Sequence, residues 1–517
     1  MKLLCPSVTL ALAALCSAEA WQPWSDNGAL RDIFQSSSYH HWKPSPCDIL
    51  SRFLPGVISY PDNAAYNASI ASYWSVQEES VLPSCVVSPK NVQEVSTAVH
   101  ILNLFGRYVP GVAKFAIRSG GHTPWAGAAN IEDGVTIDLT HLNQVTLSDD
   151  KSTVTIGPGN RWHDVYGTLV PQGLVTGGGR VAIVGVGGLV LGGGVSFFSP
   201  RKGFVCDSVT RFQVVLASGE VVNATKDSHH DLWLALKGGS NNFGIVTEIE
   251  QEVFEQGDFW GGFVGYTEDT FDAQFEAFEA LLGTPDYDPY ASLIASFVFN
   301  ATSNSWYAAH NIEYTKPEAY PKFFENFTSL PSTFSTMRIS NLTDFTVELA
   351  ASNPLGRRQL FATGTYKNSA AMMKEIFEVA NSTVQEISYV KGLSYSLSFQ
   401  PEPTIITAQS IAQGGNSLGL TIEDGPIFNV LLTVSWDDEE YDAAVDAKAK
   451  ELFVKSETKA KQTGHYNQYI YLNYAAPWQD PIKGYGSEVV AKLQATSKKY
   501  DPYGTFQKQV PGGFKLF

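Results

Sequence analysis

Two glycine-containing segments hold the residues of this sequence best suited to chemistry. The first is Arg118-Ser119-Gly120-Gly121-His122, which follows a predicted strand. Successive glycines can turn their N–H groups toward phosphate oxygens, and a histidine ending such a loop would lie beside the phosphate-bearing molecule. The residue types alone are equally compatible with a turn and an ordinary hydrogen-bonded histidine.

The second segment is the run from Thr176 to Gly194, which has nine glycines in nineteen residues. Glycines at this density let the backbone approach a planar ring or a pyrophosphate, and the alternative is a bulged turn without a ligand. The chain contains neither GxGxxG nor Gly-Lys-Ser/Thr, so neither a Rossmann loop nor a P-loop is available. It has no CxxC, HExxH or Cys/His cluster to support a metal site.

Local patterns predict the elements that must position these segments. Residues 88–107 have helical apolar spacing and lead into a strand at 115–119. Hairpins are predicted over 145–159 and 209–225, with a short helix over 161–173 between them. Short strands mixed with single helices, without regular βαβ alternation, predict an α+β lobe over about residues 80–255.

The length of 517 residues exceeds what one hydrophobic core supports, so we expect two lobes. Glycine becomes rarer after residue 256, where amphipathic stretches at 269–283 and 369–387 accompany strands such as 426–436. This change in pattern predicts a second lobe over about 256–460, consisting of a sheet backed by helices.

The net charge of −17, without a Lys/Arg-rich run, argues against nucleic acid and anionic membrane surfaces as partners. The twenty residues between Arg180 and Arg201 are uncharged and apolar enough to suggest a membrane span. Six of them are glycine, and each costs about 1 kcal/mol relative to alanine inside a helix. We therefore expect a loop close to an apolar ligand, and no membrane span.

Residues 1–20 have the pattern of a secretory signal peptide, with Lys2 before an apolar stretch and small residues at its end. We expect a secreted, extracellular protein. Six N-x-S/T sequons fit this route and predict N-glycans: Asn67, Asn223, Asn300, Asn326, Asn341 and Asn381. Of the cysteines that remain after removal of the signal peptide, we expect Cys47 and Cys85 to form a disulfide and Cys206 to be buried and inert.

Several motifs, taken in order, resemble one family. RSGGH at 118–122, GVTIDLT at 134–140, the glycine run, SVTRFQVVLASGEVV at 208–222 and LWLALKGGSNNFGIVTEI at 232–249 resemble the FAD-binding module of the vanillyl-alcohol-oxidase superfamily. The closer resemblance is to berberine-bridge-enzyme-like oxidases of the fungal secreted type. Tyr471-Leu472-Asn473-Tyr474 and DPYGTFQKQ at 501–509 are similar to that family's C-terminal segment. The resemblance extends from about Pro46 to the end and is loose between about 260 and 460.

The resemblance implies a two-lobed α+β fold with an FAD lobe at 80–255 and an antiparallel-sheet substrate lobe at 256–460. Residues 21–79 would pack on the FAD lobe, and residues 461–517 would return to it. It also implies FAD bonded covalently to His122 through the flavin 8α-methyl carbon. The cofactor-binding residues that it implies are Arg118, Ser119, Gly120, Gly121, His122, Gly179, Val181, Val184, Gly185, Gly187, Gly188, Gly192, Val246 and Asn473.

Many relatives carry a second tether, a cysteine in a GxCxxVG pattern. In this chain the corresponding stretch is Gly179 to Gly185, and Val181 occupies the cysteine position. A valine forms no thioether, so we expect a single attachment, which makes a carbohydrate substrate a weaker expectation. Val184 lies where relatives control oxygen access to the flavin, and a valine resembles the oxygen-reactive members.

For catalysis the resemblance implies Tyr474, Asn473 and Tyr471. In several relatives the tyrosine at the Tyr474 position takes a proton from a hydroxyl group, while the asparagine contacts the flavin. A phenol does this near neutral pH only beside a cation or hydrogen-bond donors, and the sequence does not show that partner. Some relatives use a glutamate of the central sheet; Gln400 lies near that place, which leaves Glu402 as a fallback. Apolar packing with a satisfied hydroxyl is the other interpretation of Tyr474.

These features predict an FAD-dependent oxidase that transfers hydride from an alcohol, phenolic or amine-type secondary metabolite to the flavin. Dioxygen would then be reduced to hydrogen peroxide. The small-molecule substrate and O2 are the expected partners, with no nucleic acid and no membrane. Three alternatives stay open: a flavin-dependent oxidative cyclase, a carbohydrate oxidase, and a flavin-binding protein without turnover.

Overall fold

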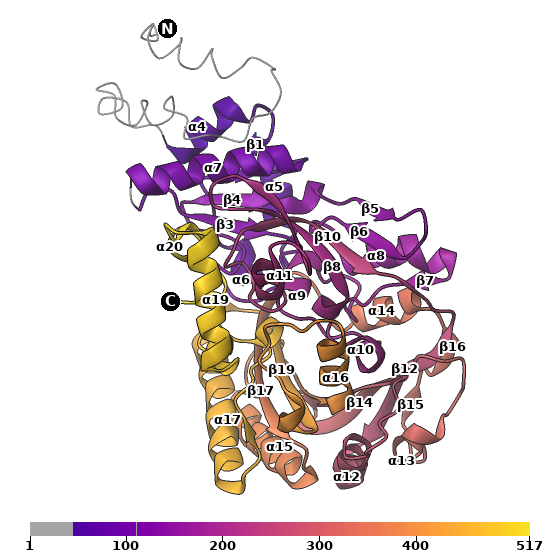
Figure 1. Ribbon diagram of the computed structural model, residues 1–517. Coiled ribbons are helices and arrows are strands. Elements are labelled where there is room, and N and C mark those ends of the chain that lie inside the picture. The colour runs from indigo at the N-terminus through magenta and orange to yellow at the C-terminus, as the bar shows by residue number, and fades with distance from the viewer. Residues whose placement is uncertain (1–44, 110) are drawn as a thin grey trace, which may run out of the picture.

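The computed structural model describes residues 45–109 and 111–517, so the predicted signal peptide lies outside the described residues. Two lobes lie one above the other in Figure 1. The upper lobe is formed mainly by the indigo to magenta residues before about 255, and the lower lobe by a large sheet and its helices. The predicted two-lobed α+β architecture is confirmed.

A four-stranded sheet in the order β1-β2-β4-β3 forms one part of the upper lobe. Its strands are β1 (Ile58–Ser59), β2 (Cys85–Val87), β3 (Phe115–Arg118) and β4 (Val135–Asp138). Strands β2 and β3 run parallel to β4, whereas β1 is antiparallel to β2. Helix α7 (Val92–Tyr108) begins at Asn91, whose side chain accepts a hydrogen bond from Glu94 N, and it leads to β3 as the apolar spacing predicted.

A five-stranded antiparallel sheet in the order β5-β6-β10-β8-β9 forms the other part of the upper lobe. The two predicted hairpins are confirmed as β5–β6 and β8–β9, and the predicted helix between them is α8 (Trp162–Leu169). The strands are β5 (Val145–Leu147), β6 (Thr153–Ile156), β8 (Val209–Val215), β9 (Val221–Thr225) and β10 (Ile245–Glu252).

The glycine run is a loop that contains one short helix, α9 (Val186–Leu191). It follows the two-residue strand β7 (Leu174–Val175), which pairs with β11 (Phe254–Glu255). Among the described residues, no helix combines the length and apolarity needed to cross a membrane.

A nine-stranded antiparallel sheet in the order β15-β12-β14-β13-β18-β19-β17-β20 forms the lower lobe, with β16 also paired to β12. The central strands have nine or ten residues each, and the strands at both edges have two or three. The strands are β12 (Phe259–Thr267), β13 (Ala291–Asn300), β14 (Ser305–Tyr314), β15 (Phe334–Ser335), β16 (Arg338–Ser340), β17 (Arg358–Lys367), β18 (Ser394–Glu402), β19 (Ile427–Trp436) and β20 (Tyr466–Asn467).

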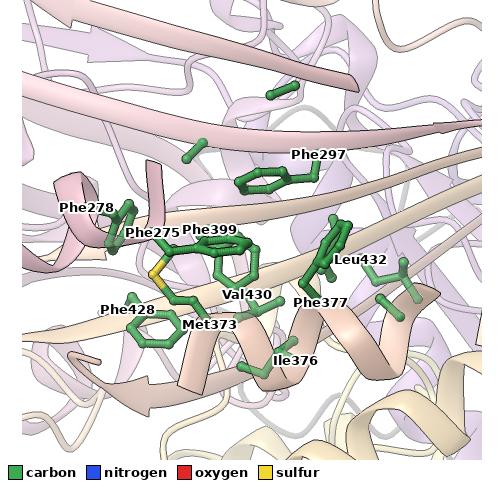
Figure 2. Packing of buried hydrophobic residues seen from close by; sticks show 14 of the residues in the cluster. Phe275, Phe278, Phe297, Met373, Ile376, Phe377, Phe399, Phe428, Val430 and Leu432 are labelled. Carbon is green, nitrogen blue, oxygen red and sulfur yellow. The ribbon is translucent and has the colours of Figure 1, made fainter. Parts of the chain in front are cut away.

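Three helices cover one face of this sheet: α12 (Phe271–Leu282), α15 (Ala370–Gln385) and α17 (Asp442–Thr463). Figure 2 shows Phe275 and Phe377 from the helices meeting Phe297 and Phe399 from the strands. Burial of each such side chain stabilises the lobe by about 1.5–3 kcal/mol. Because side chains alternate along a strand, Gln400 lies on the opposite face of β18, where it contacts the upper lobe.

The remaining helices connect or border the two lobes. Helices α10 (Ser199–Lys202) and α16 (Thr404–Ala412) pack against each other between the lobes (Figure 1). The others are α4 (Pro46–Phe53), α5 (Ala64–Ile70), α6 (Val76–Glu79), α11 (His230–Leu236), α13 (Glu325–Thr328), α14 (Leu342–Ala350), α18 (Pro481–Gly484), α19 (Ser487–Tyr500) and α20 (Thr505–Lys508).

The C-terminal segment lies against the upper lobe, where α19 and α20 run beside β3 in Figure 1. Phe115 N donates to Gln509 O at 2.7 Å, and the Phe115 and Phe506 rings meet edge to face at 6.2 Å. The segment preceding α19, which includes Tyr474, is therefore held between the two lobes.

The predicted disulfide between Cys47 and Cys85 is present, and Cys206 is buried, as expected. Four sequon asparagines are exposed: Asn67, Asn223, Asn300 and Asn326. The other two are half-buried and hydrogen-bonded. Asn341 caps α14, and Asn381 accepts a hydrogen bond from Trp306 Nε1 at 2.9 Å.

Candidate functional site

The loop after β3 and the glycine run are in backbone contact. A Cβ added to Gly120 would lie 2.4 Å from Gly185 Cα, so a side chain at either position would force the two loops apart. Ser119 connects the same loops, because its Oγ accepts a hydrogen bond from Gly187 N at 3.1 Å and donates to Pro158 O. The two segments that the sequence marked separately therefore form one surface.

Arg118 lies beneath this surface and does not face into the site. Its side chain is fully buried and forms an ion pair with Asp138 at 3.5 Å. The guanidinium also donates to Ser72 Oγ at 2.6 Å and lies 3.9 Å from the centre of the Tyr73 ring. These contacts fix the base of the loop that ends at His122.

His122 presents a neutral imidazole. Its Nε2 is buried and has no hydrogen-bond partner among the described residues. Burial, with a smaller contribution from the positive charge of Arg161, lowers the pKa of His122 to about 3. The ring stacks on Trp74 with centroids 4.2 Å apart and planes inclined by 8°. A neutral imidazole keeps a lone pair available for bond formation at physiological pH.

The other residues predicted to bind the cofactor lie around the glycine run. Gly179 packs against Trp162, and an added Cβ there would lie 2.5 Å from Trp162 Cδ1. Val181 and Val184 are half-buried, whereas Val246 is buried in β10. Gly188 is exposed, and a Cβ added to it would meet no described atom within 4 Å.

The C-terminal motif reaches the end of the glycine run. Asn473 Nδ2 donates to Leu189 O and to Tyr471 Oη, both at 3.0 Å. A Cβ added to Gly192 would lie 2.1 Å from Asn473 Oδ1, so the amide occupies the space beside that glycine. Tyr471 is buried, and its ring meets that of Tyr474 edge to face at 4.7 Å. The three predicted catalytic residues are thus in mutual contact.

Arg180 is the cation beside Tyr474 that the sequence did not reveal. Its Nη2 donates to Tyr474 Oη at 2.9 Å and to Gln400 Oε1 of β18. Arg180 is only 7% exposed, and no carboxylate of the described residues forms an ion pair with it. A retrospective signal exists, because Arg180 is the single charged residue between Thr176 and Pro200.

Glu402 lies two residues beyond Gln400 on the same face of β18. It is 6% exposed, and its Oε2 has no hydrogen-bond partner among the described residues. Burial raises the pKa of Glu402 to about 8, and the charge of Arg180 opposes this rise. The carboxyl group is therefore mainly protonated at neutral pH.

Phe361 of β17 connects the histidine to the C-terminal motif. Its ring centre lies 5.0 Å from that of Trp74, 6.5 Å from that of His122 and 6.0 Å from that of Tyr474. Both lobes and the C-terminal segment thus contribute to a single site.

Solved structures share this architecture. The 6-hydroxy-D-nicotine oxidase of Arthrobacter nicotinovorans matches with a TM-score of 0.72 at 19% identity, over 87% of this chain and 96% of that one. The BBE-like 1 protein of Physcomitrella patens matches with a TM-score of 0.71 at 18% identity, over 89% and 97% of the two chains. At these identities the similarity establishes the fold.

Sequence relatives establish the family. A family model described as an FAD binding domain matches residues 83–225. An FAD-dependent monooxygenase of Cercospora beticola is 38% identical over 510 residues, which cover 96% of this chain and 95% of that protein. One from Emericella nidulans is 39% identical over 475 residues, covering 91% and 98%. The chain belongs to the berberine-bridge-enzyme-like FAD-dependent oxidoreductases.

The site of this oxidoreductase fits FAD. The contact between Gly120 and Gly185 leaves loop backbone without side chains between it and a ligand, as pyrophosphate binding requires. The open side of Gly188 gives a planar ring access to the same surface. His122 adds a buried, unpartnered nitrogen at the end of the loop. Residues 119–122 and 185–188 would hold the cofactor, with Asn473 at its far side.

Proposed function

We propose that this FAD-dependent oxidoreductase is a secreted oxidase with its flavin tethered through His122 alone. It removes hydrogen from an alcohol, phenolic or amine group of a small secondary metabolite and uses dioxygen as the electron acceptor. The hydrogen bond from Arg180 to Tyr474 Oη, 2.9 Å long and located between the lobes, is the observation that carries this proposal. FAD, when bound, accepts hydride and passes the electrons to dioxygen.

Tyr474 is the proposed base. Its Oη takes the proton from the substrate O–H or N–H group. Arg180 donates a hydrogen bond to this oxygen and stabilises the negative charge on it before the proton arrives. Gln400 holds the guanidinium in place from β18, and Asn473 fixes the segment that carries Tyr474. The glutamate option is weaker, because Glu402 is mainly protonated at neutral pH.

A single tether is supported by the residues near the glycine run. Val181 stands where a second tether would need a thiol. In the described part of the chain the one free cysteine is Cys206, which is buried, and burial raises the pKa of its thiol well above the ordinary value. The tether therefore depends on His122, whose imidazole is neutral.

Secretion is supported by three features of the chain. Residues 1–20 have a signal-peptide pattern, and four sequons lie at exposed positions. The disulfide between Cys47 and Cys85 fits an oxidising compartment.

A monooxygenase reaction is the second candidate, because the two relatives compared above carry that name. In that reaction one atom of dioxygen enters the product, whereas an oxidase releases both as hydrogen peroxide. An oxidative cyclase, a carbohydrate oxidase and a flavin-binding protein without turnover are separated by the product: a closed ring, an oxidised sugar or none.

The first test is acid precipitation of the secreted protein. We expect the yellow flavin to stay in the pellet of the wild type and to be released from His122→Ala. A substrate screen under ¹⁸O₂ then distinguishes the reactions: peroxide equal to product indicates an oxidase, and labelled product indicates a monooxygenase. Flavin released from the wild type would rule out the tether. A flavin that no substrate bleaches would favour the non-catalytic alternative.

A further inference from the structure

A short segment before α6 touches both the histidine loop and the lower lobe. Trp74 N donates to Gly121 O at 3.0 Å, next to His122. In the other direction Trp74 Nε1 donates to Asn353 O at 3.3 Å, and Val76 N donates to Arg357 O at 3.0 Å. The indole ring of Trp74 is therefore fixed at both ends, once through its backbone and once through its ring nitrogen.

The indole is also the group that sets the orientation of the His122 ring. Trp74 is fully buried, and the two rings are stacked at 4.2 Å with only 8° between their planes. No hydrogen bond to Nε2 of His122 is available from the described residues to hold the imidazole. Phe361 contributes a more distant, tilted contact at 6.5 Å. The plane of the imidazole thus depends mainly on Trp74.

We propose that Trp74 is the positioning residue for covalent attachment of FAD to His122. The inference rests on the proposed histidyl tether. Formation of the C–N bond replaces one hydrogen of the flavin 8α-methyl group and the N–H hydrogen of the imidazole. These two hydrogens leave as two protons and two electrons, and dioxygen accepts them to give hydrogen peroxide.

The expected effect is on attachment and not on flavin binding. The dinucleotide is held by the glycine loops, which Trp74 reaches only through the backbone carbonyl of Gly121. The bond, by contrast, needs the imidazole lone pair to be aligned with the methyl carbon. A misplacement of about 1 Å costs as much as 10²-fold in rate when reacting atoms must be aligned.

The test compares Trp74→Leu with Trp74→Phe in the secreted full-length protein. Trypsin releases the peptide Ser119–Lys151, whose mass increases by one FAD when His122 is modified. We expect the fraction of bound flavin that is covalent to fall about tenfold in Trp74→Leu. Trp74→Phe keeps a stacking ring of smaller area, so it should reach full attachment, but later in a time course of secretion. Trp306→Leu, an equivalent loss of a buried indole in the lower lobe, should leave the covalent fraction unchanged.

The outcomes separate this inference from the tether itself. A wild type whose peptide carries no FAD would remove the tether and the inference together. A modified wild-type peptide with equal modification in Trp74→Leu would overturn the role of Trp74 alone. If Trp74→Leu binds no flavin, the time course of Trp74→Phe decides: attachment slower than in the wild type supports the inference, and equal rates contradict it.

Discussion

Arg180 is an almost buried cation whose hydrogen bonds go to a phenol and an amide instead of to a carboxylate. A buried charge without a counter-ion is costly, so folded proteins keep such groups mainly where a function uses them. The neutral state of the nearby Glu402 carboxyl leaves the positive charge of Arg180 uncompensated at neutral pH. The free charge is then directed at the oxygen of Tyr474.

Removal of the Tyr474 hydroxyl should slow turnover without releasing the flavin. We expect Tyr474→Phe to lower kcat by about 10²–10⁴-fold, the usual contribution of a general base. Arg180→Met should lower kcat in the same direction, because the phenolic oxygen loses its hydrogen-bond donor. Steady-state kinetics with flavin content measured in parallel check this. Arg211→Met is the control, since Arg211 pairs with Glu248 and Glu250 in the upper lobe. Wild-type kcat in Tyr474→Phe would assign the base elsewhere.

The Glu402 carboxyl should make stability depend on pH. Its pKa is raised from 4.5 to about 8 in the folded protein, so the folded state holds the proton more firmly than the unfolded state. This contribution is complete below the unfolded value and is lost as the pH rises through the folded value. We expect Glu402→Gln to flatten the decline in melting temperature between about pH 4.5 and about pH 8. Melting curves over this range test it, with exposed Glu268→Gln as the control. Parallel profiles for Glu402→Gln and the wild type would contradict it.

The contact between the two glycine loops is the feature of the site that tolerates least change at the scale of elements. In Gly185→Ala the new Cβ would lie 2.6 Å from Gly120 Cα, so the loops must separate. We expect this variant to lose bound flavin, measured as the ratio of flavin to protein absorbance. Gly167→Ala in α8 is the matched control, because its Cβ meets no described atom within 4 Å and alanine favours a helix by about 0.5–1 kcal/mol. Full flavin content in Gly185→Ala would show that the loop contact is dispensable.

The sequence predicted the elements that depend on local pattern. Apolar spacing gave α7 and α12, turn residues gave the β5–β6 and β8–β9 hairpins, and polar flanks gave the Cys47–Cys85 pair. The contacts of Arg180 with Tyr474 and of Trp74 with His122 were not predicted. Each joins residues far apart in the chain, and their meeting depends on how the two lobes and the C-terminal segment pack. A single sequence carries no periodic signal for such contacts.

The disulfide stabilises the molecule by closing a separation of 38 residues that contains Trp74 and α6. Within that loop Glu78 accepts hydrogen bonds from Gly127 N at 2.9 Å and Ala129 N at 2.6 Å, in the loop that follows His122. We expect the double variant Cys47→Ser/Cys85→Ser to lose about 2–4 kcal/mol of unfolding free energy. Denaturant and thermal unfolding measure the loss. A reducing agent should destabilise the wild type and leave the double variant unaffected; equal midpoints for the two proteins would contradict the prediction.

The two ends of the large sheet have a consequence for association between copies of this protein. The long strand β12 is covered at its outer side by β15 and β16, and β17 is covered by β20. These covering strands have only two or three residues each, so they offer few unpaired backbone groups to another polypeptide. Strand addition, the route by which exposed sheet edges recruit neighbours and start fibrils, therefore has little backbone to work with at either end.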